Sequence, residues 1–244
     1  MSQATTSSVS AREIEQFSRL AENWWDPKGP MRPLHEMNPL RTEWVDTRIA
    51  PLHAARGGTL KLLDIGCGAG LASEAFARMG HDVLGIDASG EAIAAAQVHR
   101  AAHPLAPGAG HLDYRQGSAE DLLERSERFD VVTALEVIEH VTDPQQFLHL
   151  LADLVKPGGM VAVSTLNKTF RSFAFAKLGA EYIARLLPVG THDWKKFVSP
   201  ADLSRMGRHA GLRMTDIAGM GFAPGKWRAT RDTSINYIAI FTRD

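Results

Sequence analysis

The chain has 244 residues, of which 44% are hydrophobic and 23% charged, and its formal net charge is −1. These values indicate an ordinary globular protein with enough apolar residues for a core, and they exclude a global attraction to nucleic acid. A single cysteine, Cys67, excludes an internal disulfide. No run of about 18 apolar residues predicts a membrane-spanning helix, and no signal peptide is evident. We therefore expect a cytoplasmic protein without a nucleic-acid partner.

The N-terminal part of the chain, residues 1–58, predicts a helical extension. Residues 11–25 carry apolar side chains at helical spacing, and prolines and glycines then end the pattern. A second helix is expected over 39–55, with Pro39 in its first turn. We treat residues 59–244 as a second, larger domain.

A regular alternation of short apolar runs and helical patterns begins at residue 60. Strands are expected at 60–65, 82–86, 111–116, 129–135 and 160–164. A helical insertion follows at about 167–198, then a helix at 200–210 and strands at 213–219 and 234–241. Since only a loop joins these last two strands, they should be antiparallel neighbours. The prediction is an α/β fold, a doubly wound Rossmann-like sheet of about seven strands with helices on both faces.

A glycine-rich turn follows the first expected strand. Gly66, Gly68 and Gly70 have GxGxG spacing, and Asp87 ends the second strand, where a carboxylate can accept hydrogen bonds from both hydroxyls of a ribose. A dehydrogenase more often shows GxGxxG, which binds a pyrophosphate. Here Asp64 precedes the turn, and its carboxylate suits the positively charged amino group of S-adenosylmethionine. The turn therefore favours that cofactor over NAD.

The turn after the third strand, residues 117–122, has two compatible interpretations. Ser118 could contact the adenine ring of the cofactor. It could also be the N-cap of the helix that follows.

Two carboxylates and an imidazole, Glu136, Glu139 and His140, come just after the fourth expected strand. Ligands bind at this edge of a doubly wound sheet. The three side chains could bind a divalent cation, with Mg²⁺ favoured by oxygen ligands and Zn²⁺ or Mn²⁺ open because of the histidine. Alternatively, His140 is a general base oriented by a glutamate, or the acids simply complement a helix dipole.

Longer motifs spread over residues 17 to 240 resemble the ubiquinone biosynthesis O-methyltransferase family. They are WWD at 24–26, PLH at 33–35, NPLR at 38–41, LDIGCG at 63–68, EVIEHV at 136–141, LVKPGG at 154–159, STLN at 164–167, GAEYI at 179–183 and GTHD at 190–193. The resemblance implies a class I methyltransferase domain at 59–244. It also implies S-adenosylmethionine as methyl donor and methylation of hydroxyls on polyprenylated phenols and catechols.

The resemblance also implies roles for individual residues. Arg41 should bind the carboxylate of the cofactor, Gly66 should lie against its methionine portion, and Asp87 should hold its ribose. Leu135 should contact it through the backbone. Because eukaryotic members are described as Mg²⁺-dependent, the resemblance favours the cation at residues 136–140. Trp24 and Trp25 could pack in the core or cover the substrate.

A water-insoluble substrate would have to be taken from a membrane. In the insertion, the helical pattern of 170–187 confines Lys177, Glu181 and Arg185 to a narrow strip beside a wide apolar arc. This pattern predicts reversible docking on an anionic membrane surface, peripheral on the inner face, or a helix that caps the core. A quinone-biosynthesis enzyme assembly is a further expected partner. The alternatives are another phenolic substrate, or a non-catalytic subunit of that assembly.

Overall fold

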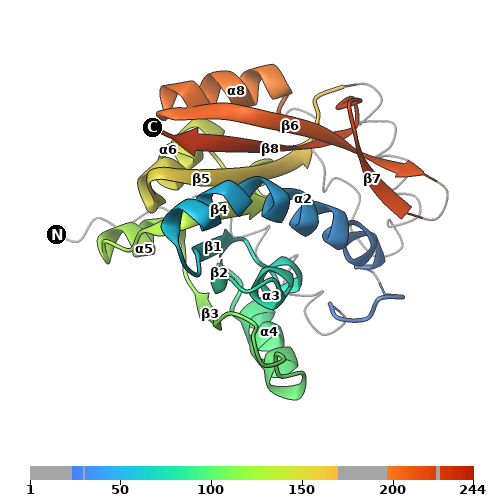
Figure 1. Cartoon of the computed structure of the whole chain (residues 1–244). Coiled ribbons are helices and arrows are strands. Elements are labelled where there is room, and N and C mark those ends of the chain that lie inside the picture. The colour runs from blue at the N-terminus through green and yellow to red at the C-terminus, as the bar shows by residue number, and fades with distance from the viewer. Residues whose placement is uncertain (1–23, 30, 170–196, 224–225) are drawn as a thin grey trace.

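The computed structural model describes residues 24–29, 31–169, 197–223 and 226–244, and in them an eight-stranded sheet of order β3-β2-β1-β4-β5-β8-β6-β7 (Figure 1). β1 to β5 run parallel, and β8 pairs antiparallel with both β5 and β6. The strands are β1 Lys61–Ile65, β2 Asp82–Asp87, β3 Leu112–Gln116, β4 Phe129–Leu135, β5 Val155–Leu166, β6 Leu212–Ala223, β7 Lys226–Thr230 and β8 Asn236–Arg243. The predicted doubly wound α/β sheet is confirmed.

Helices cover both faces of the sheet. α2, α3 and α4 lie on one face, and α5, α6 and α8 on the other (Figure 1). Their bounds are α2 Arg32–Arg56, α3 Leu71–Arg78, α4 Gly90–Ala102, α5 Ala119–Glu124, α6 Pro144–Leu154 and α8 Pro200–His209. No helix within the four described ranges is long and apolar enough to cross a membrane.

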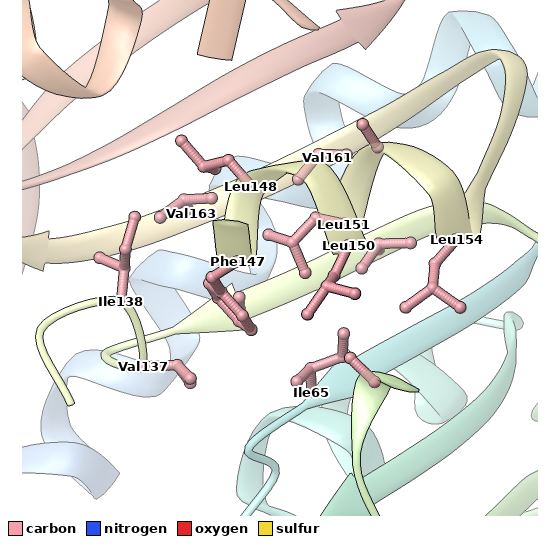
Figure 2. Packing of buried hydrophobic residues seen from close by; sticks show 14 of the residues in the cluster. Ile65, Val137, Ile138, Phe147, Leu148, Leu150, Leu151, Leu154, Val161 and Val163 are labelled. Atoms are coloured by element: carbon pink, nitrogen blue, oxygen red, sulfur yellow. The ribbon is translucent and has the colours of Figure 1, made fainter. Parts of the chain in front are cut away.

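Two apolar clusters, one on each face, form the core. Successive strand residues point to opposite faces, so Leu62 belongs to the cluster under α2 and α3 while Leu63 belongs to the cluster under α6. Figure 2 shows the second cluster, where Phe147 and Leu151 of α6 pack near Val161 of β5. Since α2 contributes to the first cluster, the expected N-terminal extension shares a core with the sheet.

Several predicted boundaries were wrong. The helix expected at 39–55 begins at Arg32, with Pro33 in its first turn and Pro39 inside it. Trp24 and Trp25 form a turn and are not the end of a helix. The described sheet has eight strands because β7 pairs antiparallel with the last part of β6, and the predicted antiparallel pairing of the last long strands is confirmed. The insertion pattern at 170–187 lies outside the described residues.

Candidate active site

The parallel strands β1, β2 and β4 end at the same edge of the sheet, and the glycine turn follows β1 there. Gly66 and Gly68 have φ angles of 67° and 55°, the left-handed region that favours glycine. A Cβ on Gly66 would lie 2.6 Å from Val137 Cγ2, and one on Gly68 would lie 2.7 Å from Trp24 Cη2. The bare α-carbons therefore let two distant segments pack directly on the turn.

Asp87 ends β2 beside this turn. Its carboxylate oxygens accept hydrogen bonds from the backbone N–H groups of Gly68 and Ser89, both at 2.9 Å. Burial raises the pKa of Asp87, and these hydrogen bonds oppose the increase. Each oxygen retains a further lone pair, so the carboxylate can still accept hydrogen bonds from the hydroxyls of a ribose.

Asp64, at the end of β1, is engaged inside the protein. Its two oxygens accept hydrogen bonds from Ser73 Oγ at 2.6 Å and Thr133 Oγ1 at 2.7 Å. Burial raises the pKa of Asp64, while the two hydroxyls lower it. Asp64 thereby ties the base of the glycine turn to α3 and β4, and its predicted contact with an amino group stays a prediction.

Arg41 of α2 is buried near the same edge, with a relative exposure of 4%. Its Nη2 lies 3.4 Å from Asn38 Oδ1, and its Nη1 lies 4.0 Å from Glu136 Oε1. Burial lowers the pKa of Arg41, against the opposing charges of nearby carboxylates. Its Nε is buried and has no hydrogen-bond partner among the described residues. An unpaired buried donor is costly, and a ligand carboxylate would satisfy it.

The segment after β4 turns sharply. Leu135 ends the strand half-buried, and Glu136 then takes a left-handed φ of 60°, which is unusual for a residue other than glycine. The backbone N–H of Glu136 donates to Ser164 O at 3.0 Å, and Ser164 Oγ donates to Glu136 Oε1 at 2.6 Å. The strained residue is thus held from β5.

Apolar residues in the turn after β4 anchor the segment that carries the two glutamates. Val137 and Ile138 enter the cluster under α6 (Figure 2), and Glu139 is buried with its Oε2 accepting a hydrogen bond from Thr165 Oγ1 at 2.9 Å. Burial, and secondly the nearby Glu136 carboxylate, raises the pKa of Glu139 to about 7. A carboxyl with such a pKa can take up or release a proton near neutral pH.

The predicted metal triad is not assembled in this structure. Within the described part of the chain, no three His, Cys, Asp or Glu side chains are grouped so that they could hold a metal ion. The physical reason is that Glu136 is drawn to Ser164 and Glu139 to Thr165. Glu136, Glu139 and His140 therefore do not fit a cation site here, and no catalytic step is assigned to Mg²⁺.

Ser118 is the N-cap of α5. Its Oγ accepts a hydrogen bond from Asp121 N at 3.3 Å, and its own N–H donates to Asp121 Oδ2 at 2.7 Å. This reciprocal pair is a capping box. The capping interpretation of Ser118 is confirmed, and the contact with adenine stays a prediction.

Comparison with known proteins settles the family. A family model described as a methyltransferase domain matches residues 34–217. The ubiquinone biosynthesis O-methyltransferases of Azorhizobium caulinodans and Thiobacillus denitrificans are each 46% identical to the chain over 98% of its length, and over 96% and 99% of their own. That of Pelagibacter ubique is 41% identical over 97% of this chain and 99% of its own length.

The chain belongs to the ubiquinone biosynthesis O-methyltransferase family. The resemblance drawn from its motifs is therefore confirmed.

Solved structures agree on the fold of this family member. Magnesium protoporphyrin IX methyltransferase from Synechocystis, solved with bound S-adenosylhomocysteine, superposes with a TM-score of 0.64 at 21% identity, covering 96% of this chain and 95% of that one. An S-adenosylmethionine-dependent methyltransferase from Thermotoga maritima also gives a TM-score of 0.64, at 16% identity and covering 95% and 99% of the two chains. The sheet is that of S-adenosylmethionine-dependent methyltransferases.

Two further residues of the candidate site, Ser164 and Thr165, were not predicted from the sequence. They lie near the end of β5, the strand beside β4, and they donate hydrogen bonds to Glu136 and Glu139. The signal was available in the STLN motif, because polar residues at the end of an apolar parallel strand mark the ligand edge of the sheet.

Proposed function

We propose that this protein methylates phenol or catechol hydroxyls of polyprenylated ubiquinone precursors, with S-adenosylmethionine as the methyl donor. The observation that supports the proposal is a pair of side chains at the edge of the sheet where the glycine turn follows β1, which we call the glycine edge. Both side chains can still bind a ligand. They are Arg41, with a buried unpaired Nε, and Asp87, whose carboxylate can accept more hydrogen bonds. A guanidinium and a carboxylate match the two polar ends of the cofactor, its methionine carboxylate and its ribose.

In this proposal each residue at the edge has one role. Arg41 binds the cofactor carboxylate, the turn at Gly66 and Gly68 lies against the methionine portion, and Asp87 accepts from the ribose hydroxyls. Ser118 lies near the adenine. Leu135 contributes its backbone from the end of β4, which pairs with β1 directly beneath the turn.

The reaction is an in-line attack by a phenolic oxygen on the methyl carbon bound to sulfur. The O–C bond forms, the C–S bond breaks, and the electron pair remains on the sulfur of S-adenosylhomocysteine. The phenolic proton, with an ordinary pKa of about 10, must leave near neutral pH. We assign its removal to His140, half-buried in the turn after β4, with Glu139 and Glu136 beside it.

Metal dependence is tested separately, by turnover after chelation. Activity that survives removal of divalent cations is expected if His140 acts alone. Activity that disappears on chelation and returns with Mg²⁺ would contradict this assignment.

Turnover with a panel of catechols and short-chain prenylphenols tests the function itself. We expect methyl transfer from S-adenosylmethionine, with better kcat/KM for prenylated rings than for the same rings without a prenyl chain. Equal rates on both would indicate an O-methyltransferase of another small phenol. No transfer to any phenol would refute the proposal.

We also propose that the protein is cytoplasmic and docks reversibly on the inner face of the membrane through residues 170–187. The support is the sequence pattern, with its wide apolar arc and three basic residues against one acid. Flotation of the full chain with anionic and with neutral vesicles tests this, and binding should prefer the anionic vesicles and weaken in high salt. Equal, negligible binding to both would refute it.

A further inference from the structure

A short segment from the start of the described chain lies over the glycine turn. Trp24 is almost fully buried, and its six-membered ring packs on the α-carbon of Gly68. Its atom Cε2, which carries the indole Nε1, would lie 3.0 Å from a Cβ on Gly68. Because the Gly68 N–H donates to Asp87, this tryptophan borders the proposed ribose site.

The neighbouring residue Trp25 fixes this arrangement. Its Nε1 donates a hydrogen bond to Ala69 O in the glycine turn at 3.0 Å. Its ring stacks on His99 of α4, with centroids 3.4 Å apart and planes 1° apart. The backbone oxygen of Trp24 lies 2.8 Å from His35 Nε2 of α2. Two helices and the turn therefore hold the segment in one position.

The ring of His99 is itself held from α3. Its Nε2 lies 3.3 Å from Oε2 of Glu74, a buried carboxylate whose other oxygen, Oε1, accepts a hydrogen bond from Arg78 at 2.7 Å. Because the ring of His99 stacks on Trp25 and on His103 and lies within ion-pair distance of Glu74, it supports the segment above the turn.

One polar atom of this packed segment has no partner. Trp24 Nε1 is buried and makes no hydrogen bond within the described residues. Buried indole N–H groups normally find an acceptor. Trp44 and Trp227 also have an unpartnered Nε1, but they pack with the cluster under α2, whereas Trp24 packs on the glycine turn. An acceptor supplied by a bound ligand would satisfy Trp24.

We propose that Trp24 is a cofactor-binding residue whose Nε1 donates a hydrogen bond to S-adenosylmethionine or S-adenosylhomocysteine, and that Trp25 is a positioning residue acting through it. This inference rests on the proposed cofactor site at the glycine edge. It adds the segment before α2 to that site.

The test is titration calorimetry of S-adenosylhomocysteine into full-length variants. Trp24→Phe keeps an aromatic ring on Gly68 and removes only the donor, so affinity should fall roughly five- to tenfold. Trp44→Phe is the matched control, since it removes an unpartnered buried Nε1 away from the turn, and its affinity should stay within about twofold of wild type. Equal affinities for Trp24→Phe and wild type would overturn the proposal, as would equal losses in both variants.

A double-mutant cycle tests the positioning role of Trp25. Trp25→Phe alone should weaken binding, but it should add little loss in the Trp24→Phe background, because it acts through Trp24. Fully additive losses would overturn this role. If the wild-type protein itself does not bind S-adenosylhomocysteine, the proposed function has failed, and that result is distinct from a Trp24→Phe variant that binds like wild type.

Discussion

Buried acids lie at both ends of β4, and the protein compensates their charges to different extents. At its beginning, Asp130 accepts hydrogen bonds from the Lys61 N–H at 3.0 Å and from Lys156 Nζ at 2.9 Å, with Arg56 Nε 3.7 Å away. Burial by itself raises the pKa of Asp130, but these hydrogen bonds and positive charges hold it below its usual value. Every charge there is compensated by the protein.

Beyond the other end of β4, compensation is incomplete. Glu139 is buried with one hydroxyl partner and a second carboxylate nearby, so its pKa is raised to about 7. Arg41 retains an unpaired Nε, and Glu136 keeps a left-handed backbone. Uncompensated buried charges, unpaired donors and strained backbone are destabilising, and they are typical of ligand-binding and catalytic sites. We therefore expect the residues at the beginning of β4 to contribute to stability and those beyond its other end to contribute to the proposed site.

The largest expected effect is on the pH dependence of stability. The folded-state pKa of Glu139 lies above the ordinary pKa of a glutamate. The stabilising contribution of Glu139 is therefore fully present when the pH is below the ordinary pKa, and it is lost as the pH rises through about 7. The Glu139→Gln variant should not show this loss. Its free energy of unfolding, relative to that of wild type, should therefore be higher at pH 8 than at pH 4 by up to about 3 kcal/mol. Denaturant unfolding at several pH values measures it. Parallel pH profiles for the variant and wild type would contradict the assignment.

The next effect is on cofactor affinity. Asp87→Ala should weaken S-adenosylhomocysteine binding by about 1–3 kcal/mol, because ligand hydroxyls lose a charged acceptor. Calorimetry measures the change, and thermal unfolding of the free variant shows whether it is folded. Unchanged affinity would remove Asp87 from the site.

The smallest effect concerns the compensated end of β4. Asp130→Asn should lower the free energy of unfolding by about 1–2 kcal/mol at neutral pH, since Lys156 and Arg56 lose their charged partner. The depressed pKa of Asp130 means that this contribution is present above its ordinary pKa and is lost as pH falls, so the variant should approach wild type in acid. Affinity for S-adenosylhomocysteine should not change. A loss of affinity as large as that of Asp87→Ala would break the contrast between the two ends.

The sequence predicted the elements with strong local signals. β4 at 129–135 has the bounds expected from its apolar pattern, and α8 covers 200–209 where a helix was expected at 200–210. The antiparallel pairing of β6 with β7 was missed because Gly219 and Gly221 lie inside β6, and glycine weakens a strand pattern. The start of α2 was missed because two prolines, Pro33 and Pro39, both suit a first turn.

The sequence predicted those parts of the candidate site that lie within one short segment. The glycine turn and Asp87 follow from strand ends and spacing. The hydrogen bonds from Ser164 to Glu136 and from Thr165 to Glu139, and the packing of Trp24 on Gly68, join segments far apart in the chain. Spacing along a sequence does not encode such contacts. For the same reason, the proximity of Glu136, Glu139 and His140 in the sequence suggested a metal triad that their hydrogen bonds do not assemble.

A crystal structure with bound S-adenosylhomocysteine would show directly whether the proposed cofactor site is correct. We expect the ligand beside the glycine turn, with its ribose hydroxyls hydrogen-bonded to Asp87 and its carboxylate bonded to the guanidinium of Arg41. A ligand bound elsewhere, or one beside the turn whose ribose and carboxylate contact neither residue, would contradict the proposed site.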